Sequence, residues 1–266
     1  QELTLQLSTA NEFVTVTDWY YNIEYLEEKT RGYDYKEDLF VPGYFEVPIK
    51  KGESIIFSAS TEEVKPSTLK RKFQQMENKR ERRDDFESSL TYSASQFIVH
   101  EGKDTKVVAG YPWFGRWGRD TFIALPGLTL AAGGDLRNCK EVLDTMVRQL
   151  HDGLFPNIGK GDKAAYNSID APMWFFWAVL EYDKALGEPG MVWKNYGSKM
   201  KSILTAFREG VNPGLRMDAN GLIWARQPGK ALTWMDAVVR GVPVTPRAGY
   251  AVEINALWCD EVCYML

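Results

Sequence analysis

An aromatic, arginine-containing loop near the middle of this 266-residue sequence ends in an Arg-Asp pair. It reads Tyr-Pro-Trp-Phe-Gly-Arg-Trp-Gly-Arg-Asp from Tyr111 to Asp120, and an apolar stretch follows. The indole of Trp117 can cover the C–H face of a sugar ring, while the Arg119 guanidinium and the Asp120 carboxylate can pair with neighbouring hydroxyls. Asp120 also stands where a helix N-cap belongs, so a capping Asp beside an arginine is the alternative.

A second polar cluster surrounds Asp170, in the stretch Tyr-Asn-Ser-Ile-Asp-Ala-Pro-Met-Trp-Phe-Phe-Trp that begins at Tyr166. The segment Asp-Gly-Leu-Phe-Pro-Asn at 152–157 precedes it. Asn167 or Ser168 could cap the next helix, with Asp170 in the first turn, where the helix dipole favours a carboxylate. The same pattern places a carboxylate and aromatic rings at the mouth of a helix, where a loop can present both to a ligand.

The third candidate is Asp236, which follows Trp234 in the segment Leu-Thr-Trp-Met-Asp. Its neighbours suggest an apolar setting. Desolvation favours the protonated form of a carboxyl group, which is what a general acid requires. The alternative is a half-buried Asp paired with Arg240 or Arg247.

Glu253 and Asn255 lie two positions apart on an otherwise apolar predicted helix, close to Trp258. Polar groups in such a place must find hydrogen-bond partners, and a ligand is one option.

Metal and redox chemistry find little support in the sequence. Cys139, Cys259 and Cys263 make no complete disulfide framework, and no two of them have the spacing of a zinc or redox pair. His100 and His151 have no Cys or His cluster around them, so we expect no transition-metal site.

The charge pattern argues against a nucleic-acid partner. The formal net charge is −4, and the one basic run, from Lys65 to Glu87, interleaves both signs as a solvated helix face does. No stretch has the roughly 18 apolar residues of a membrane span. We expect a cytoplasmic protein, but the chain begins at Gln1 without a Met, so a processed product from a secreted or periplasmic parent stays open.

The elements that must position these residues follow from hydrophobic periodicity. Period-two alternation at 3–17 and short apolar runs among Pro and Gly at 39–60 predict strands. One long helix is predicted from about 68 to 98, where Gly and Pro are absent. Further helices are expected at 120–133, 137–151, 170–186, 191–209 and 249–266. With only one short strand-like piece at 221–224, the region after residue 110 is predicted to be all-α.

Three segments taken in order resemble the amylo-α-1,6-glucosidase domain of glycogen debranching enzymes: WFGRWGRDTFIALPGL, GLFPNIGKGDKAAYNSIDAPMWF and LTWMDAVVRGVPVTPRAGYAVEINALW. The resemblance covers about residues 108–266. Upstream, YDYKEDLFVPG resembles the end of the β-rich N-terminal domain of bacterial and archaeal members. The resemblance implies a mainly α fold, part of an (α/α)6 toroid, preceded by a short β-rich segment from a β-sandwich-like domain. The expected domains are 1–65 for the β-rich part, 66–110 for the connecting helix and linker, and 111–266 for the first half of the toroid.

The resemblance also implies a reaction: hydrolysis of the α-1,6-linked glucose at a branch point, with inversion at the anomeric carbon. Carried over by motif, Asp236 matches the general acid. The remaining matches imply substrate binding, with Arg119 and Asp120 gripping the terminal glucose, Trp117 and Trp234 as walls, and Asp170, Arg247 and Glu253 at further family positions. No cofactor is implied, since acid/base hydrolysis by carboxyl groups needs none. The implied partner is a branched α-glucan or oligosaccharide.

An inverting glycosidase also needs a carboxylate base roughly 6.5–9.5 Å from the acid. The family places this base in later helices, and Glu253 matches the substrate-facing or structural residues instead, so we expect the base beyond residue 266. Three alternatives stay open. They are a non-catalytic carbohydrate-binding remnant of the same fold, a general α-glucosidase, and an all-α interaction scaffold, which would leave the Trp/Arg/Asp loops unexplained.

Overall fold

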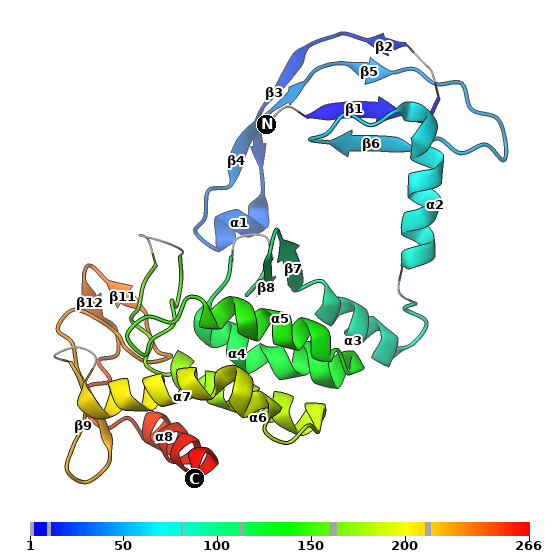
Figure 1. Cartoon of the computed structure of the whole chain (residues 1–266). Helices are drawn as coiled ribbons and strands as arrows, with labels where there is room; N and C mark the ends of the chain where they lie inside the picture. The colour runs from blue at the N-terminus through cyan, green and yellow to red at the C-terminus, as the bar shows by residue number, and fades with distance from the viewer. Residues whose placement is uncertain (1–2, 10–11, 81, 112–113, 160–163, 211–213) are drawn as a thin grey trace. The chain divides into compact units, whose positions relative to one another are not determined.

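The computed structural model describes residues 3–9, 12–80, 82–111, 114–159, 164–210 and 214–266 (Figure 1). The chain separates into two compact units, Gln1–Glu81 and Arg82–Leu266. The division falls inside the stretch 66–110 that the sequence suggests as a connector.

The first unit is built on a long antiparallel ribbon whose strands pair in nested order. The pairs are β1 (Thr4–Leu7) with β6 (Phe57–Ser60), β2 (Phe13–Val14) with β5 (Tyr44–Phe45), and β3 (Asp18–Glu24) with β4 (Lys36–Val41). The short helix α1 (Leu26–Thr30) joins β3 to β4. The strands predicted within 3–17 and 39–60 are confirmed, and the aromatic segment between them is itself the strand β3. Among the described residues of this unit, only two hydrophobic side chains, Leu7 and Leu69, are buried, so the ribbon has little core of its own.

The single long helix predicted over 68–98 is wrong. The structure has a 3₁₀ turn η1 (Pro66–Thr68), a helix α2 (Leu69–Lys79), an extended residue at Arg80, and a separate helix α3 (Phe86–Ser95). Asp85 starts α3 with a capping box, in which its Oδ1 accepts from the Ser88 backbone N–H at 2.7 Å. An Asp followed three residues later by Ser thus begins a new helix without any Gly or Pro.

The second unit is mainly helical, and the helices predicted after residue 118 are confirmed. Their bounds are α4 (Gly118–Pro126), α5 (Leu136–Val147), α6 (Ala171–Leu186), α7 (Met191–Glu209) and α8 (Val252–Met265). α4 continues into a π-helical turn, η2 (Gly127–Ala131). Pro126, which lacks a backbone N–H, lies at this change of helix type.

α6 lies at the centre of the second unit and packs against α4, α5, α7 and α8 (Figure 1). Its buried face is aromatic. The ring of Phe175 lies 5.4 Å from that of Phe122 on α4 and 5.2 Å from that of Phe155, in edge-on or tilted geometry. Tyr196 on α7 reaches the same ring at 6.2 Å. This cluster holds the start of α4 and the start of α6 in fixed positions relative to each other.

The prediction that the region after residue 110 is all-α is wrong, although the strand-like piece at 221–224 does overlap a strand. Among its described residues, this region has two short hairpins, β9 (Leu215–Met217) with β10 (Ile223–Ala225) and β11 (Val238–Val239) with β12 (Val242–Pro243). A further hairpin of the second unit, β7 (Ile98–Glu101) with β8 (Asp104–Val107), lies before residue 110. Each strand has two to four residues, which is too short for a clear period-two signal.

Candidate functional site

Arg119 contacts side chains from the two other stretches that the sequence singles out, those around Asp170 and Asp236. It lies in the first turn of α4, and its side chain is nearly buried. Its Nε donates to Asp170 Oδ2 at 2.6 Å, one terminal nitrogen donates to Ser168 Oγ at 3.2 Å, and the other to Asp236 Oδ2 at 3.3 Å. The planar guanidinium therefore fixes two carboxylates and a hydroxyl at once.

Backbone contacts around Arg119 explain why the loops meet there. A Cβ at Gly118 would lie 2.6 Å from the Pro156 carbonyl oxygen, so only glycine allows the start of α4 to approach this close. The Gly118 N–H donates to the Asn157 carbonyl at 2.9 Å. On the other side, the Ile169 N–H donates to the Leu232 carbonyl at 2.9 Å and ties the loop of the third stretch to the entry of α6.

Asp170 is a buried, fully engaged carboxylate, with 2% of its surface exposed. One oxygen accepts from Arg119 and the other from the Ser168 hydroxyl. Burial alone lowers the pKa of the Arg119 guanidinium, but the hydrogen bonds and charges of Asp170 and Asp236 outweigh this effect and raise the pKa above its ordinary value. The prediction that Asn167 or Ser168 caps α6 is wrong. Asp170 itself holds the N-cap position, and no side chain makes the capping hydrogen bond there.

Asp236 is the accessible carboxylate of this cluster. Its side chain is 31% exposed, so the apolar setting expected from its neighbours is wrong. The alternative pairing was wrong in detail as well, since its guanidinium partner is Arg119 rather than Arg240 or Arg247. The Asn157 side-chain amide lies 3.4 Å from the same carboxylate oxygen that Arg119 contacts.

Two buried side chains, Asn157 in contact with Asp236 and Thr233 three residues before it in the sequence, have hydrogen-bonding capacity left. Asn157 and Thr233 are 3% and 2% exposed, and neither Asn157 Oδ1 nor Thr233 Oγ1 meets a partner among the described residues. Buried groups of this kind are usually satisfied by protein, water or ligand. The sequence reasoning did not name Asn157 or Ser168 as site residues, although both lie in the stretches it singled out. The sequence signal that could have pointed to Asn157 is its position directly after Phe-Pro, at the end of an apolar run.

Trp234, Arg247 and Glu253 form a second cluster. The Arg247 guanidinium lies over the Trp234 ring, 5.5 Å from its centroid, and contacts the Glu253 carboxylate at 2.5 Å. The indole remains 53% exposed. No described contact joins this cluster to Arg119, although Trp234 is only two residues from Asp236.

The side chains of Trp117 and Asp120 make no described contact with the Arg119 cluster. The Trp117 ring meets Phe114 edge-on at 6.1 Å and lines a cavity beside the β7–β8 hairpin. Asp120 is exposed in the first turn of α4, and the N-cap of this helix is Trp117, so Asp120 as the capping residue is wrong.

Asn255 and Trp258 have structural partners. The Asn255 side chain accepts from the Ile223 N–H at 2.7 Å and donates to the Ile223 carbonyl at 3.1 Å, so it completes the edge of β10. The Trp258 indole N–H donates to the Gly221 carbonyl at 3.1 Å. A ligand is therefore not needed to satisfy Asn255.

Across the ranges that the structure describes, no group of three or more His, Cys, Asp or Glu side chains could hold a metal ion. The three cysteines are free, with Cys139 buried and Cys259 and Cys263 exposed. A search of the same ranges finds no helix with the length and apolar character needed to cross a bilayer.

The Arg119 cluster thus offers a half-exposed carboxylate held by a guanidinium and an amide, with unmet buried acceptors beside it. It lies where α4 and α6 begin. Such an arrangement can bind hydroxyl groups in a fixed orientation and exchange a proton with one of them.

Comparison with known proteins assigns this helical, carboxylate-bearing unit to a class of glycosidases. Residues 92–266, well over half of the chain, match the amylo-alpha-1,6-glucosidase family, and the chain belongs to that family. Residues 1–56 match a second family model, glycogen debranching enzyme N terminal.

A curated relative is the glycogen debranching enzyme of Saccharomyces cerevisiae. It is 26% identical to this chain over a 241-residue alignment that covers 65% of the chain and 16% of the yeast protein. The chain therefore spans about a sixth of the length of this relative.

Proposed function

We propose that the protein carrying this chain hydrolyses α-1,6-linked glucose at the branch points of a glycogen-like α-glucan. Asp236 is the general acid of this proposal, and it protonates the glycosidic oxygen as the bond to glucose breaks. The observation that carries the proposal is the half-exposed Asp236 carboxylate, oriented by Arg119 and Asn157, in a chain of the amylo-alpha-1,6-glucosidase family.

The division of labour among the carboxylates supports this choice. Asp170 is buried and both of its oxygens are engaged, so its role is to position Arg119. Asp236 keeps solvent access and has a single guanidinium contact at 3.3 Å, which a substrate hydroxyl can replace or share. The Asn157 side-chain amide contacts the same carboxylate oxygen of Asp236 and helps to orient it.

We further propose that the helices form part of an (α/α)6 toroid. The helix contacts support this proposal, because α6 packs against α4 and α8, the alternate helices along the chain, as well as against α5 and α7. Each inner helix then begins near the same end of the ring, and a site formed by the starts of α4 and α6 agrees with this arrangement.

The reaction of this proposal inverts the anomeric configuration. An inverting reaction requires a base roughly 6.5–9.5 Å from the acid, with room for a water molecule. Asp170 does not suit this role because its oxygens are occupied, and Glu253 is paired with Arg247. We propose that the base comes from a part of the protein beyond Leu266.

The other predicted residues keep proposed substrate roles. Trp234, with Arg247 and Glu253 behind it, offers an exposed indole face two residues from the acid. Trp117 is proposed as a wall on the other side of Arg119. Asp120 is exposed and has no described ion pair, so its carboxylate is free to accept from a glucose hydroxyl.

The test uses the full-length protein and measures glucose released from a branched limit dextrin by the wild type and by Asp236→Asn. General acid catalysis contributes about 10²–10⁴-fold, so Asp236→Asn should lose activity by that factor and still bind the substrate. Asp84→Asn, at an exposed carboxylate outside the cluster, is the matched control. Turnover by Asp236→Asn at the wild-type rate would remove Asp236 from the mechanism.

A linear maltooligosaccharide in the same assay separates the alternatives. Release of glucose from it at a rate similar to that from the limit dextrin would identify a general α-glucosidase. Binding of both substrates without turnover by the wild type would identify a carbohydrate-binding remnant.

A further inference from the structure

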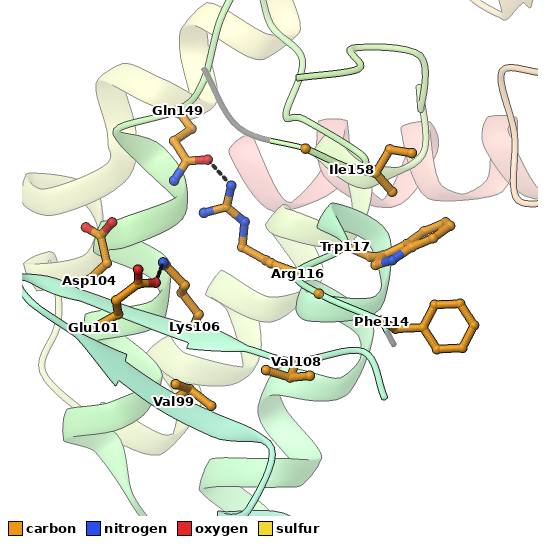
Figure 2. A pocket seen from close by; sticks show the side chains of 12 residues that line it. Val99, Glu101, Asp104, Lys106, Val108, Phe114, Arg116, Trp117, Gln149 and Ile158 are labelled. Carbon is orange, nitrogen blue, oxygen red and sulfur yellow. Dashed lines mark hydrogen bonds and ion pairs between the residues drawn. The ribbon is translucent and has the colours of Figure 1, made fainter. Parts of the chain in front are cut away.

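A cavity of about 520 Å³ lies beside the β7–β8 hairpin, and its lining does not include Arg119, Asp170 or Asp236 (Figure 2). Its size is within the roughly 300–1,000 Å³ typical of small-molecule sites. Its walls come from the hairpin, from the loop before α4, and from residues 149 and 158–159. None of the residues predicted from the sequence belongs to it except Trp117.

The hairpin presents a single face to this cavity. Strand side chains alternate between faces, so Val99 and Glu101 on β7 share a face with Asp104 and Lys106 on β8 and with Val108 just after it. The cross-strand pairs Val99 with Lys106 and Glu101 with Asp104 agree with this assignment, and all five residues line the cavity.

The opposite face anchors the hairpin to α5. The Thr105 N–H donates to Thr145 Oγ1 at 3.0 Å, and the Thr105 hydroxyl donates to Glu141 at 2.8 Å. Arg148, at the C-terminal end of α5, forms an ion pair with Asp104 of β8, and its guanidinium nitrogen lies 2.7 Å from Asp104 Oδ1. The hairpin that forms this wall of the cavity is therefore held against α5 by hydrogen bonds and an ion pair.

The remaining walls combine aromatic surface with a guanidinium. Phe114 and Trp117 lie at one side of the cavity with their rings edge-on, and Ile158 lies above them in Figure 2. The Arg116 guanidinium points at the neutral side-chain carbonyl of Gln149, and no carboxylate pairs with it in the described parts of the chain. Burial lowers the pKa of Arg116, and the negative charge of Asp104 offsets this effect only in part.

The carboxylates of the lining disfavour an anion. Lys106 is paired with Glu101 and Arg148 with Asp104, and the charge of Asp104 also acts on Arg116. The two carboxylates among the lining residues would repel a phosphate or another anion. A neutral ligand with an apolar face and several hydroxyls fits an apolar floor of Val99 and Val108, aromatic side walls, and donors at the rim.

We propose that this cavity binds an unbranched segment of an α-glucan chain, as a second carbohydrate site next to the one at Asp236. The choice of glucan as the ligand rests on the proposed function, whereas the cavity and its lining of aromatic rings and hydrogen-bonding side chains do not. The glucan stacks on Phe114, and Arg116 and Gln149 hydrogen-bond its hydroxyls. Because Arg116 lies three residues before Arg119, a chain held here is anchored within reach of the other site.

Titration calorimetry with maltoheptaose tests the proposal, on a background of Asp236→Asn so that no hydrolysis occurs. Phe114→Ala and Arg116→Gln should each weaken the dissociation constant by about 10-fold or more, as removal of a central aromatic or arginine contact does. Phe86→Ala and Arg137→Gln are the matched controls in the same unit, since both side chains are strongly exposed and lie outside the cavity. A thermal melt of each variant verifies folding.

Three results would overturn the proposal: no maltoheptaose binding by the background protein, unchanged affinity in both cavity variants, or equal weakening in the control variants. Failure of the proposed function gives a different result. The wild type then releases no glucose from limit dextrin, while the loss of maltoheptaose affinity in Phe114→Ala and Arg116→Gln still appears.

Discussion

Removal of the charge at Arg119 is expected to destabilise the second unit strongly. Arg119→Met keeps a side chain of similar length but leaves Asp170 buried, 2% exposed, with only the Ser168 hydroxyl as a partner. Loss of one partner of a buried ion pair costs about 3–5 kcal/mol. The contact with Asp236 adds little to this, because that carboxylate is 31% exposed and water can replace the guanidinium.

The assay is thermal unfolding of the wild type, Arg119→Met, Asp170→Asn and the double variant. For a unit of 150–250 residues, each kcal/mol lowers Tm by about 2–4 °C, so Arg119→Met should lower Tm by about 6–20 °C. The double variant removes the stranded charge, and a coupling free energy of about 0.5–3 kcal/mol should appear as partial recovery. Arg137→Met, at an exposed pair with Glu141, is the control and should leave Tm nearly unchanged.

A fall in Tm no larger for Arg119→Met than for the control would refute this reasoning. Strict additivity of the two single effects on Tm in the double variant would also refute it, because Arg119 and Asp170 would then contribute to stability independently.

Three further predictions concern stability. Gly118→Ala places a methyl group 2.6 Å from the Pro156 carbonyl oxygen, so we expect a loss of about 1–3 kcal/mol in denaturant unfolding, and unchanged stability would contradict the close approach. Asn255→Ala leaves the β10 backbone edge unpaired and should cost about 1–3 kcal/mol, whereas a neutral effect in the same assay would show that water replaces the side chain. Burial, and more weakly the charge of Asp260, raises the pKa of Glu261 well above its ordinary value near 4.5. The unfolded chain therefore loses a proton that the folded chain keeps, and stability falls as pH rises above about 4.5. Glu261→Gln should flatten this part of a Tm-against-pH curve, and an unchanged slope would contradict the expectation.

The helices of the second unit were predictable because their apolar positions repeat over three or more turns. Helix α7 has the predicted bounds, 191–209, since a left-handed Gly190 precedes it and Gly210 follows it. The break before α3 was missed because Asp85 caps the new helix within a run of charged residues that carries no Gly or Pro. The β7–β8 hairpin was missed because each strand has only four residues and both faces mix polar and apolar side chains, so no period-two pattern shows.

The types of the site residues were predictable, but their pairing was not. The sequence singles out Arg119, Asp170 and Asp236 by their aromatic and polar surroundings. Which arginine pairs with Asp236 depends on how the loops after α5 and before β11 fold back onto the starts of α4 and α6. That folding is fixed by contacts such as the Ile169 to Leu232 hydrogen bond, which has no local sequence signal.

The hydrogen bonds of Arg119 span 51 residues to Asp170 and 117 residues to Asp236. Contacts of such long range are lost in the unfolded chain, because closing large loops costs chain entropy. A compound that touches all three side chains therefore binds the folded unit and not the unfolded chain. Its binding raises the melting temperature of the whole unit by mass action. A thermal-shift screen of sugars could thus find ligands of this cluster without any assay of turnover.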